Sequence, residues 1–282
     1  FDYKGETNKI KTKKPLIFEN IYNFKDKNLL IKKGLILTKG VNVEYKGEIK
    51  NLFNIKEIEP DLEIKISDTN LQDLISLVPD TVIPFQEPYV QNIKKYNANA
   101  IVNGGAKFKF KDIDNFSVKG KLNFDDVYVV ERPKNAKTSF GECEFLGRNV
   151  IITVYANAPK GSILTVVGKT RMQKMPYAEF SIKSTGKLDL AFAHKVLMPV
   201  QKILNLKLGP LPYMTLKGNG TIELKTKGTK EKANLKGFFE TNDATVTLNG
   251  LNTVLTNGKV KVVFDEDKII FNNAQGLIEG AK

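Results

Sequence analysis

Apolar and polar residues alternate along most of this chain, with the period of two that is typical of strands with one buried face. The alternation is clearest at residues 106–111, 221–225 and 259–264, where apolar positions fall on one side and lysines on the other. Runs of this kind, separated by Gly, Asn and Asp, are typical of an antiparallel meander. The pattern predicts a mainly β protein with short helical inserts.

Strand ends are predicted where Gly or Asn can adopt a positive φ and where Asp can accept a hydrogen bond from the local backbone. Such points are Asp125-Asp126, Asn249-Gly250, Asn257-Gly258 and residues 265–267.

Two stretches break the alternation and have apolar residues at helical spacing. One covers residues 70–78 and the other runs from Leu188 to about Leu206, with His194 inside it. Asp68 or Thr69 is the predicted N-cap of the first helix, because either side chain can accept a hydrogen bond from a free amide. Each helix is expected to lie as a lid on the apolar face of the sheet.

A tandem repeat of about 117 residues is the main organisational feature. Residues 118–120 and 235–237 align as Val-Lys-Gly and Leu-Lys-Gly, and the two segments stay in phase onward without a gap, so that Gly141 falls on Gly258. A shared period of this size indicates repeated supersecondary units stacked side by side. We expect a partial unit at 1–60 and two units at 61–176 and 177–282, joined in one continuous structure.

Composition narrows the class of protein. With 282 residues and 41% apolar residues, the chain is too apolar to be disordered. A net charge of +13 favours anionic partners such as lipid headgroups. Nucleic acid is disfavoured, because only Arg132, Arg148 and Arg171 supply the planar guanidinium group that base-reading sites prefer. The sequence begins without Met and has no apolar run near 20 residues, so we expect a fragment whose membrane anchor lies elsewhere.

No constellation of residues predicts catalysis. His194 is the one histidine, so it has no second imidazole for a metal pair or a triad. Cys143 aligns with Val260 in the repeat, which indicates a small buried apolar side chain instead of a nucleophile. The acidic residues 265–267 lack the ligand spacing of a calcium loop. We therefore expect a protein that is not an enzyme and that uses no cofactor or metal.

The order of these segments resembles the AsmA-like family, which includes TamB and YhdP. The resemblance rests on residues 28–66, on 122–129 and on 235–280, where Leu-Lys-Gly is followed by Asn-Asp-Ala-Thr-Val. It implies a periplasmic body, held at the inner membrane by an anchor outside this sequence, in which a long curved β-sheet forms an open hydrophobic groove. It also implies transport of phospholipids or other acylated lipids between the inner and outer bacterial membranes.

Two hypotheses remain open at this point. In the first, the apolar face is a groove that binds acyl chains. In the second, the sheet has a dry core and acts as a scaffold for envelope proteins, with outer-membrane proteins as partners. Both assign the same inward positions by alternation: Phe108, Phe110, Cys143, Phe145, Ile152, Val154, Phe180, Ile182, Ile222, Leu224, Val260, Val262, Ile269 and Phe271.

Overall fold

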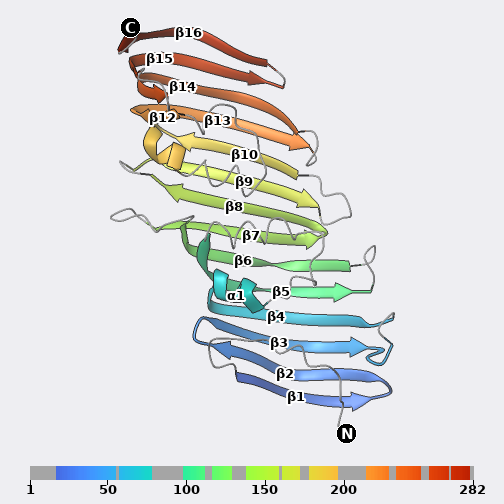
Figure 1. Ribbon diagram of the computed structural model, residues 1–282. Coiled ribbons are helices and arrows are strands. Elements are labelled where there is room, and N and C mark those ends of the chain that lie inside the picture. The colour runs from blue at the N-terminus through green and yellow to red at the C-terminus, as the bar shows by residue number, and fades with distance from the viewer. Residues whose placement is uncertain are drawn as a thin grey trace.

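A computed structural model of the chain describes residues 17–54, 57–77, 98–111, 116–128, 138–158, 161–171, 178–195, 214–228, 233–248, 254–266 and 268–279. These residues form one long antiparallel sheet that does not close on itself (Figure 1). Strands β1 and β16 are its two edges, and neighbours in the chain are neighbours in the sheet from β1 to β10. After β10 the path continues through β13, β14, β15 and β16.

The strand bounds are β1 Ile17–Lys25, β2 Asn28–Thr38, β3 Val41–Lys50, β4 Glu59–Asn70, β5 Asn99–Phe110, β6 Phe116–Tyr128, β7 Ser139–Gly147 and β8 Asn149–Asn157. They continue as β9 Ile163–Arg171, β10 Ala178–Thr185, β11 Leu188–Asp189, β12 Met214–Lys217, β13 Asn219–Gly228, β14 Ala233–Leu248, β15 Val254–Asp265 and β16 Lys268–Glu279. The short β11 pairs with β13, and β12 pairs with β14.

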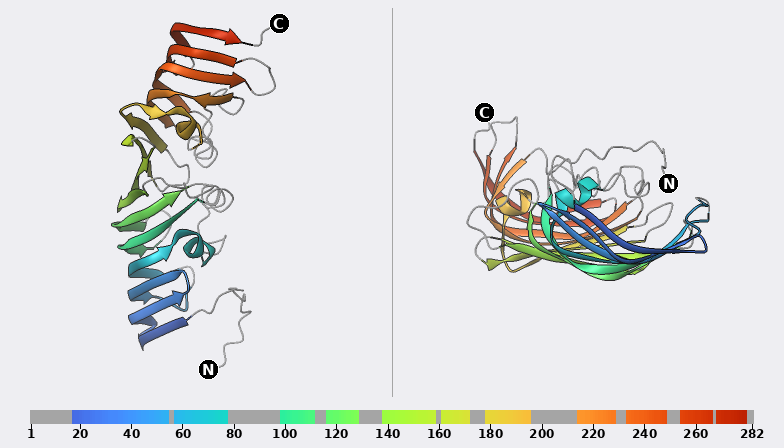
Figure 2. Two further views of the ribbon diagram at one scale, coloured as in Figure 1. Left: turned by 90° about the vertical axis from the view of Figure 1, so that its left-hand side faces the viewer. Right: turned by 90° about the horizontal axis from the view of Figure 1, so that it is seen from below.

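The strands are bent along their length, so that the sheet has a concave and a convex side (Figure 2). Two short helices lie on the concave side: α1, Leu71–Leu77, and a helical segment at residues 190–195. Each helix interrupts the chain between two strands that pair with each other, namely β4 with β5 and β10 with β13. A helix in this place covers the sheet without breaking the strand order.

The strands predicted from alternation are confirmed, and two of the predicted strand ends are wrong. Asp126 and Asn257 have φ values of 52° and 51°, but they lie inside β6 and β15. The strand register shifts at both places, so these residues form β-bulges and the strands continue beyond them. The turn at Glu266 is confirmed, with φ of 55° between β15 and β16. Asn249-Gly250 lies outside the described residues.

Both predicted helices are present, but their first turns differ from the prediction. Asn70 caps α1, because its Oδ1 accepts a hydrogen bond from the Asp73 amide at 3.2 Å. Thr69, a predicted cap, is fully buried and instead binds across to the backbone of Asn42. Asp68, the other predicted cap, donates its amide to Asn103.

The second helix begins at Leu190 and not at Leu188, which belongs to β11. Asp189 is its N-cap, since Oδ1 accepts a hydrogen bond from the Phe192 amide at 2.9 Å. His194 lies in this helix, as predicted. Its predicted continuation to about Leu206 falls outside the described residues.

The sheet is continuous across the expected unit boundaries. The boundary at 60/61 falls within β4, which pairs with β3 on one side and β5 on the other. The boundary at 176/177 lies outside the described residues, and β9 and β10 pair along eight residues on either side of it. The extents of the repeat units stay a prediction.

Candidate functional site: the apolar face of the sheet

The pairing register assigns every residue to one side of the sheet, because directly opposed residues of an antiparallel pair point to the same side. Leu122 pairs with Cys143, Cys143 with Ile152, Ile152 with Gly168, and Gly168 with Phe180. Most residues that lie along this register, in both directions across the sheet, are apolar residues or glycines, with occasional Thr and Ser. We call this side the apolar face and the opposite side the polar face.

All fourteen positions chosen by alternation fall on the apolar face. Five of them are buried, six are half-buried, and Ile152 is 41% exposed. Ile269 and Phe271 belong to the same register through their pairing with Phe264 and Val262. The structure therefore brings the predicted residues together on one surface that spans β5 to β16, and their contact with a ligand remains a prediction.

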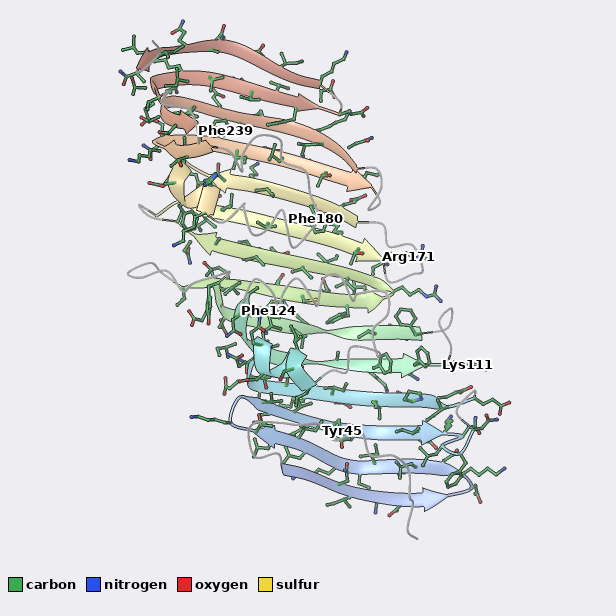
Figure 3. All side chains as sticks on the ribbon, viewed as in Figure 1. Tyr45, Lys111, Phe124, Arg171, Phe180 and Phe239 are labelled. Atoms are coloured by element: carbon green, nitrogen blue, oxygen red, sulfur yellow. The ribbon has the colours of Figure 1, made fainter. Side chains whose placement is uncertain are left out.

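The apolar face extends beyond the predicted residues, toward β3 and between the predicted strands. The missed residues follow the same alternation of apolar and polar positions, so applying that alternation to every strand would have identified them. Figure 3 shows four aromatic members of this face, Tyr45, Phe124, Phe180 and Phe239, spread along the sheet. The residues missed include Val43, Tyr45, Leu62, Ile64, Ile66, Leu122, Phe124, Leu164, Val166, Phe239 and Phe264.

Part of the apolar face is covered by the second helix. Phe192 and Ala193 of the helical segment pack with Leu164, Ile182 and Ile222, which lie on β9, β10 and β13. Leu164 is fully buried and Ile182 is 3% exposed. Because the helices lie on the concave side in Figure 2, this packing shows that the apolar face is the concave one.

A second part of the apolar face, on β5 to β8, keeps solvent-accessible side chains beside its buried ones. Phe108 and Phe110 stack with their ring centroids 6.2 Å apart, and both are half-buried. Phe145 is also half-buried, and Ile152 exposes 41% of its surface although it lies directly opposite the buried Cys143. Large apolar side chains with this much contact with solvent, gathered on one surface, are typical of binding sites.

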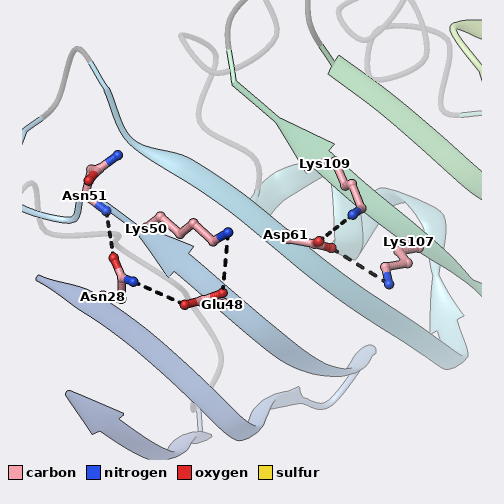
Figure 4. Close-up of polar contacts among 7 residues, drawn as sticks. All are labelled: Asn28, Glu48, Lys50, Asn51, Asp61, Lys107 and Lys109. Carbon is pink, nitrogen blue, oxygen red and sulfur yellow. Dashed lines mark hydrogen bonds and ion pairs between the residues drawn. The ribbon is translucent and has the colours of Figure 1, made fainter. Parts of the chain in front are cut away.

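The polar face carries the charges. In Figure 4, Asp61 holds Lys109 at 2.7 Å and Lys107 at 4.0 Å, while Glu48 contacts Lys50 and Asn28. These side chains lie on the opposite side of their strands from the apolar residues. Ion pairs as exposed as these stabilise a fold only slightly. They keep the polar face hydrated, with positive and negative charges side by side.

Several of these charges have shifted pKa values. A hydrogen bond to Glu142, 2.6 Å away, raises the pKa of Lys121. Hydrogen bonding to Lys225 and the charge of Lys183 lower the pKa of the Glu223 carboxyl. The contacts with Glu266 and Asp265 raise the pKa of Lys236. In each case the neighbour stabilises the charged form.

Cys143 is buried on the apolar face, as its alignment with Val260 predicted. Burial raises the pKa of its thiol to about 12, because a thiolate would lose its hydration there. The side chain therefore acts as a small apolar group at neutral pH.

Two kinds of functional feature are absent from the described part of the chain. No group of three or more His, Cys, Asp or Glu side chains there is arranged to hold a metal ion. Among those same residues, none of the helices has the length and apolar character needed to cross a membrane.

Comparisons with protein-family models, with curated proteins and with solved structures found no match to this chain. The resemblance to the AsmA-like family thus remains a prediction from the order of its segments.

Proposed function

We propose that this chain binds the acyl chains of phospholipids in a hydrophobic groove formed by the concave apolar face, and that it contributes to lipid transport between the inner and outer bacterial membranes. The observation that carries the proposal is the unbroken apolar face on one side of an open sheet, with Ile152 still 41% exposed within it. Apolar surface in water costs about 25 cal/mol per Å², so an accessible face of this extent favours an apolar ligand.

The length of the face suits such a ligand. Fourteen strands follow one another along the main path of the sheet, which at about 4.8 Å per strand gives a length of about 60 Å. An acyl chain has no groups that require a fixed hydrogen-bond partner, so it can bind at many positions along the face. Binding and conduction along a surface of this kind need no catalytic residue.

The proposal places lipid over β5 to β8 and not under the second helix. The cluster around Leu164, Ile182 and Leu224 is already filled by the helix and by β11. Phe108, Phe110 and Ile152 have no comparable cover among the described residues and keep solvent-accessible surface. In this reading the two helices are fixed lids over part of a groove that is otherwise open.

Tandem units of about 117 residues are the second part of the proposal. Two features support them: each helix is capped by an Asx residue, Asn70 or Asp189, and each follows a strand that pairs with the strand after the helix. Units that share this order would extend one groove along one axis instead of forming separate cores. The periplasmic location, and attachment through an anchor outside this sequence, rest on the family resemblance alone.

Lipid binding can be tested on the purified 282-residue chain by lipid extraction and by uptake of a fluorescent phospholipid from vesicles. We expect co-purified phospholipid and saturable uptake. Ile152→Asp should reduce uptake at least about tenfold, because it places a charge on the exposed part of the apolar face. Leu146→Asp is the matched control, since Leu146 is 50% exposed on the neighbouring strand but points to the polar face.

Equal uptake by the two variants would overturn the proposal, provided that both keep the circular dichroism spectrum and the melting temperature of the parent chain. The scaffold hypothesis would then gain support, because it requires a dry interior and no lipid. It makes its own prediction at a buried position: Val262→Asp should unfold a dry core.

A further inference from the structure

Strand β16 ends the sheet, and in the described part of the chain no strand pairs with its outer side (Figure 1). An edge of this kind exposes a row of unpaired backbone amides and carbonyls, and proteins usually protect it with charged residues or proline. Residues 269–278 include neither. Ile270, Leu277 and Ile278 are 43%, 61% and 65% exposed. β16 therefore has the composition of an interior strand, although it lies at an edge.

The backbone of β16 also resembles that of β15, an interior strand. Asn273 in β16 has a φ of 52° and Asn257 in β15 has a φ of 51°, and the register shifts beside each of them, so each strand contains a bulge. β15 nevertheless pairs with β14 on one side and with β16 on the other. The bulge at Asn273 therefore leaves the outer side of β16 able to pair in the same way.

This bulge makes the pattern of faces along β16 symmetric about the centre of the strand. Asn272 and Gln275 pair with Lys261 and Lys259, which lie two residues apart on the polar face. One residue between Asn272 and Gln275 is thus extra, and the alternation changes its phase there. The polar-face positions are 268, 270, 272, 275, 277 and 279, and the apolar-face positions are 269, 271, 276 and 278.

The sequence of β16 is complementary to itself in antiparallel orientation. When two copies of the strand are opposed about their common centre, each position lies opposite one on the same face. Lys268 then opposes Glu279 of the second copy, and opposite charges in this arrangement stabilise a strand pair. The other opposed pairs are Ile269 with Ile278, Ile270 with Leu277, Phe271 with Gly276 and Asn272 with Gln275.

One of these opposed pairs repeats an arrangement that occurs inside the sheet. Phe180 on β10 lies directly opposite Gly168 on β9. Phe271 opposite Gly276 of the second copy is again an aromatic residue paired with a glycine across two antiparallel strands. The contact between two copies thus uses the same kind of cross-strand pair as the sheet itself.

We propose that two copies of this chain associate through β16, paired antiparallel about a two-fold axis perpendicular to the sheet. Such a contact is isologous, because each copy uses the same surface, and the assembly closes as a dimer. The axis keeps both apolar faces on one side, so the two open sheets continue as one sheet about twice as long. The inference goes beyond the proposed function, because the contact forms without lipid.

Sedimentation velocity of the delipidated 282-residue chain over a range of concentrations tests the contact. We expect a monomer–dimer equilibrium with a dissociation constant of about 10 µM, because a strand edge buries less surface than most stable protein interfaces.

Ile270 and Leu277 oppose each other in the proposed dimer and provide matched variants. Ile270→Lys/Leu277→Glu places opposite charges together and should still dimerise. Ile270→Lys/Leu277→Lys places like charges together and should dimerise at least about tenfold more weakly. Ile270→Glu/Leu277→Glu should weaken dimerisation in the same way although it lowers the net charge, which separates the local effect from overall repulsion. Because both side chains are exposed, none of the three variants should lower the melting temperature of the monomer.

Three results would overturn the inference. The first is a parent chain that stays monomeric at about ten times the expected dissociation constant. The second is equal dimerisation of the three variants, which would show that Ile270 and Leu277 do not oppose each other. The third is a series of oligomers larger than a dimer, which would indicate pairing of β16 with β1 of another copy. None of these results affects lipid uptake, which is measured separately.

Discussion

The ring of Phe180 on β10 fills the space that a side chain at Gly168 on β9 would occupy. A β-carbon at position 168 would lie 2.9 Å from Cε1 of Phe180, closer than carbon atoms approach each other without strain. The two residues are directly opposed in the register. The same arrangement recurs where Tyr45 covers Gly34, so aromatic rings lying on cross-strand glycines help to pack an apolar face that has no second sheet against it.

A double-mutant cycle tests this relationship. Gly168→Ala should destabilise the chain by about 1 kcal/mol, because the new methyl group displaces the Phe180 ring. In a Phe180→Ala background the same change should cost nothing or stabilise slightly, since Ala restricts the unfolded chain more than Gly does. Urea unfolding of the four proteins gives the coupling free energy. An equal cost in both backgrounds would show that the ring does not occupy this space.

The sequence predicts which residues share a face better than it predicts where strands end. Alternation alone assigns Phe108 and Val262 to one surface, and the register agrees because side-chain direction has a period of two. Asp126 and Asn257 misled the prediction because a positive φ serves a bulge as well as a turn. Distinguishing the two requires knowing whether the next strand continues to pair, which depends on residues far away in the chain.

The helix caps and the accessibility of the apolar face differ in how far the sequence could predict them. Asp189 three residues before Phe192 is a recognisable N-cap pattern, so the start of the second helix at Leu190 was open to prediction. By contrast, Cys143 and Ile152 pair directly, yet one is 4% exposed and the other 41%. Alternation assigns both to the same side and carries no information on which of them another element covers.

The covered and accessible parts of the apolar face should respond differently to truncation. Leu164→Ala should destabilise the chain by about 3 kcal/mol, because Leu164 is fully buried beneath the second helix and its loss leaves a cavity. Ile152→Ala should cost less than about 1 kcal/mol, because solvent or ligand can fill the space. Chemical denaturation of both variants after delipidation makes the comparison. Similar costs at the two positions would indicate a uniformly dry core.

Asp189 should stabilise the second helix through its cap. Asp189→Ala removes the acceptor for the Phe192 amide and is expected to cost about 1 kcal/mol, whereas Asp189→Asn keeps an acceptor and should cost much less. Thermal unfolding followed by circular dichroism compares the two. Hydrogen exchange at the Phe192 amide should increase in the Ala variant alone, and unchanged exchange would contradict the cap.

The Cys143 thiol should be unreactive in the folded chain. With its pKa raised to about 12 and its side chain buried, it should react with iodoacetamide at pH 8 at least about a hundredfold more slowly than in urea. A control with Cys143→Ala and Leu146→Cys moves the thiol to an exposed position on the same strand and should react rapidly when folded. Rapid alkylation of the native parent chain would show that this part of the sheet opens readily.

The Glu223 carboxyl should titrate below the ordinary range for glutamate, because Lys225 donates a hydrogen bond to it and Lys183 adds a second positive charge. A lowered pKa in the folded state means that the ionised carboxyl stabilises the fold above the unfolded pKa. That contribution disappears as the pH falls below about 4 and through the pKa of the folded state.

A carbon-detected NMR titration measures the midpoint of the Glu223 titration directly, and Lys183→Gln with Lys225→Gln should raise it toward that of an isolated glutamate. Added salt should shift the midpoint in the same direction, since all three side chains are on the solvated polar face. If neither the double lysine substitution nor added salt moves the midpoint, the cross-strand contacts between β10 and β13 do not persist in solution.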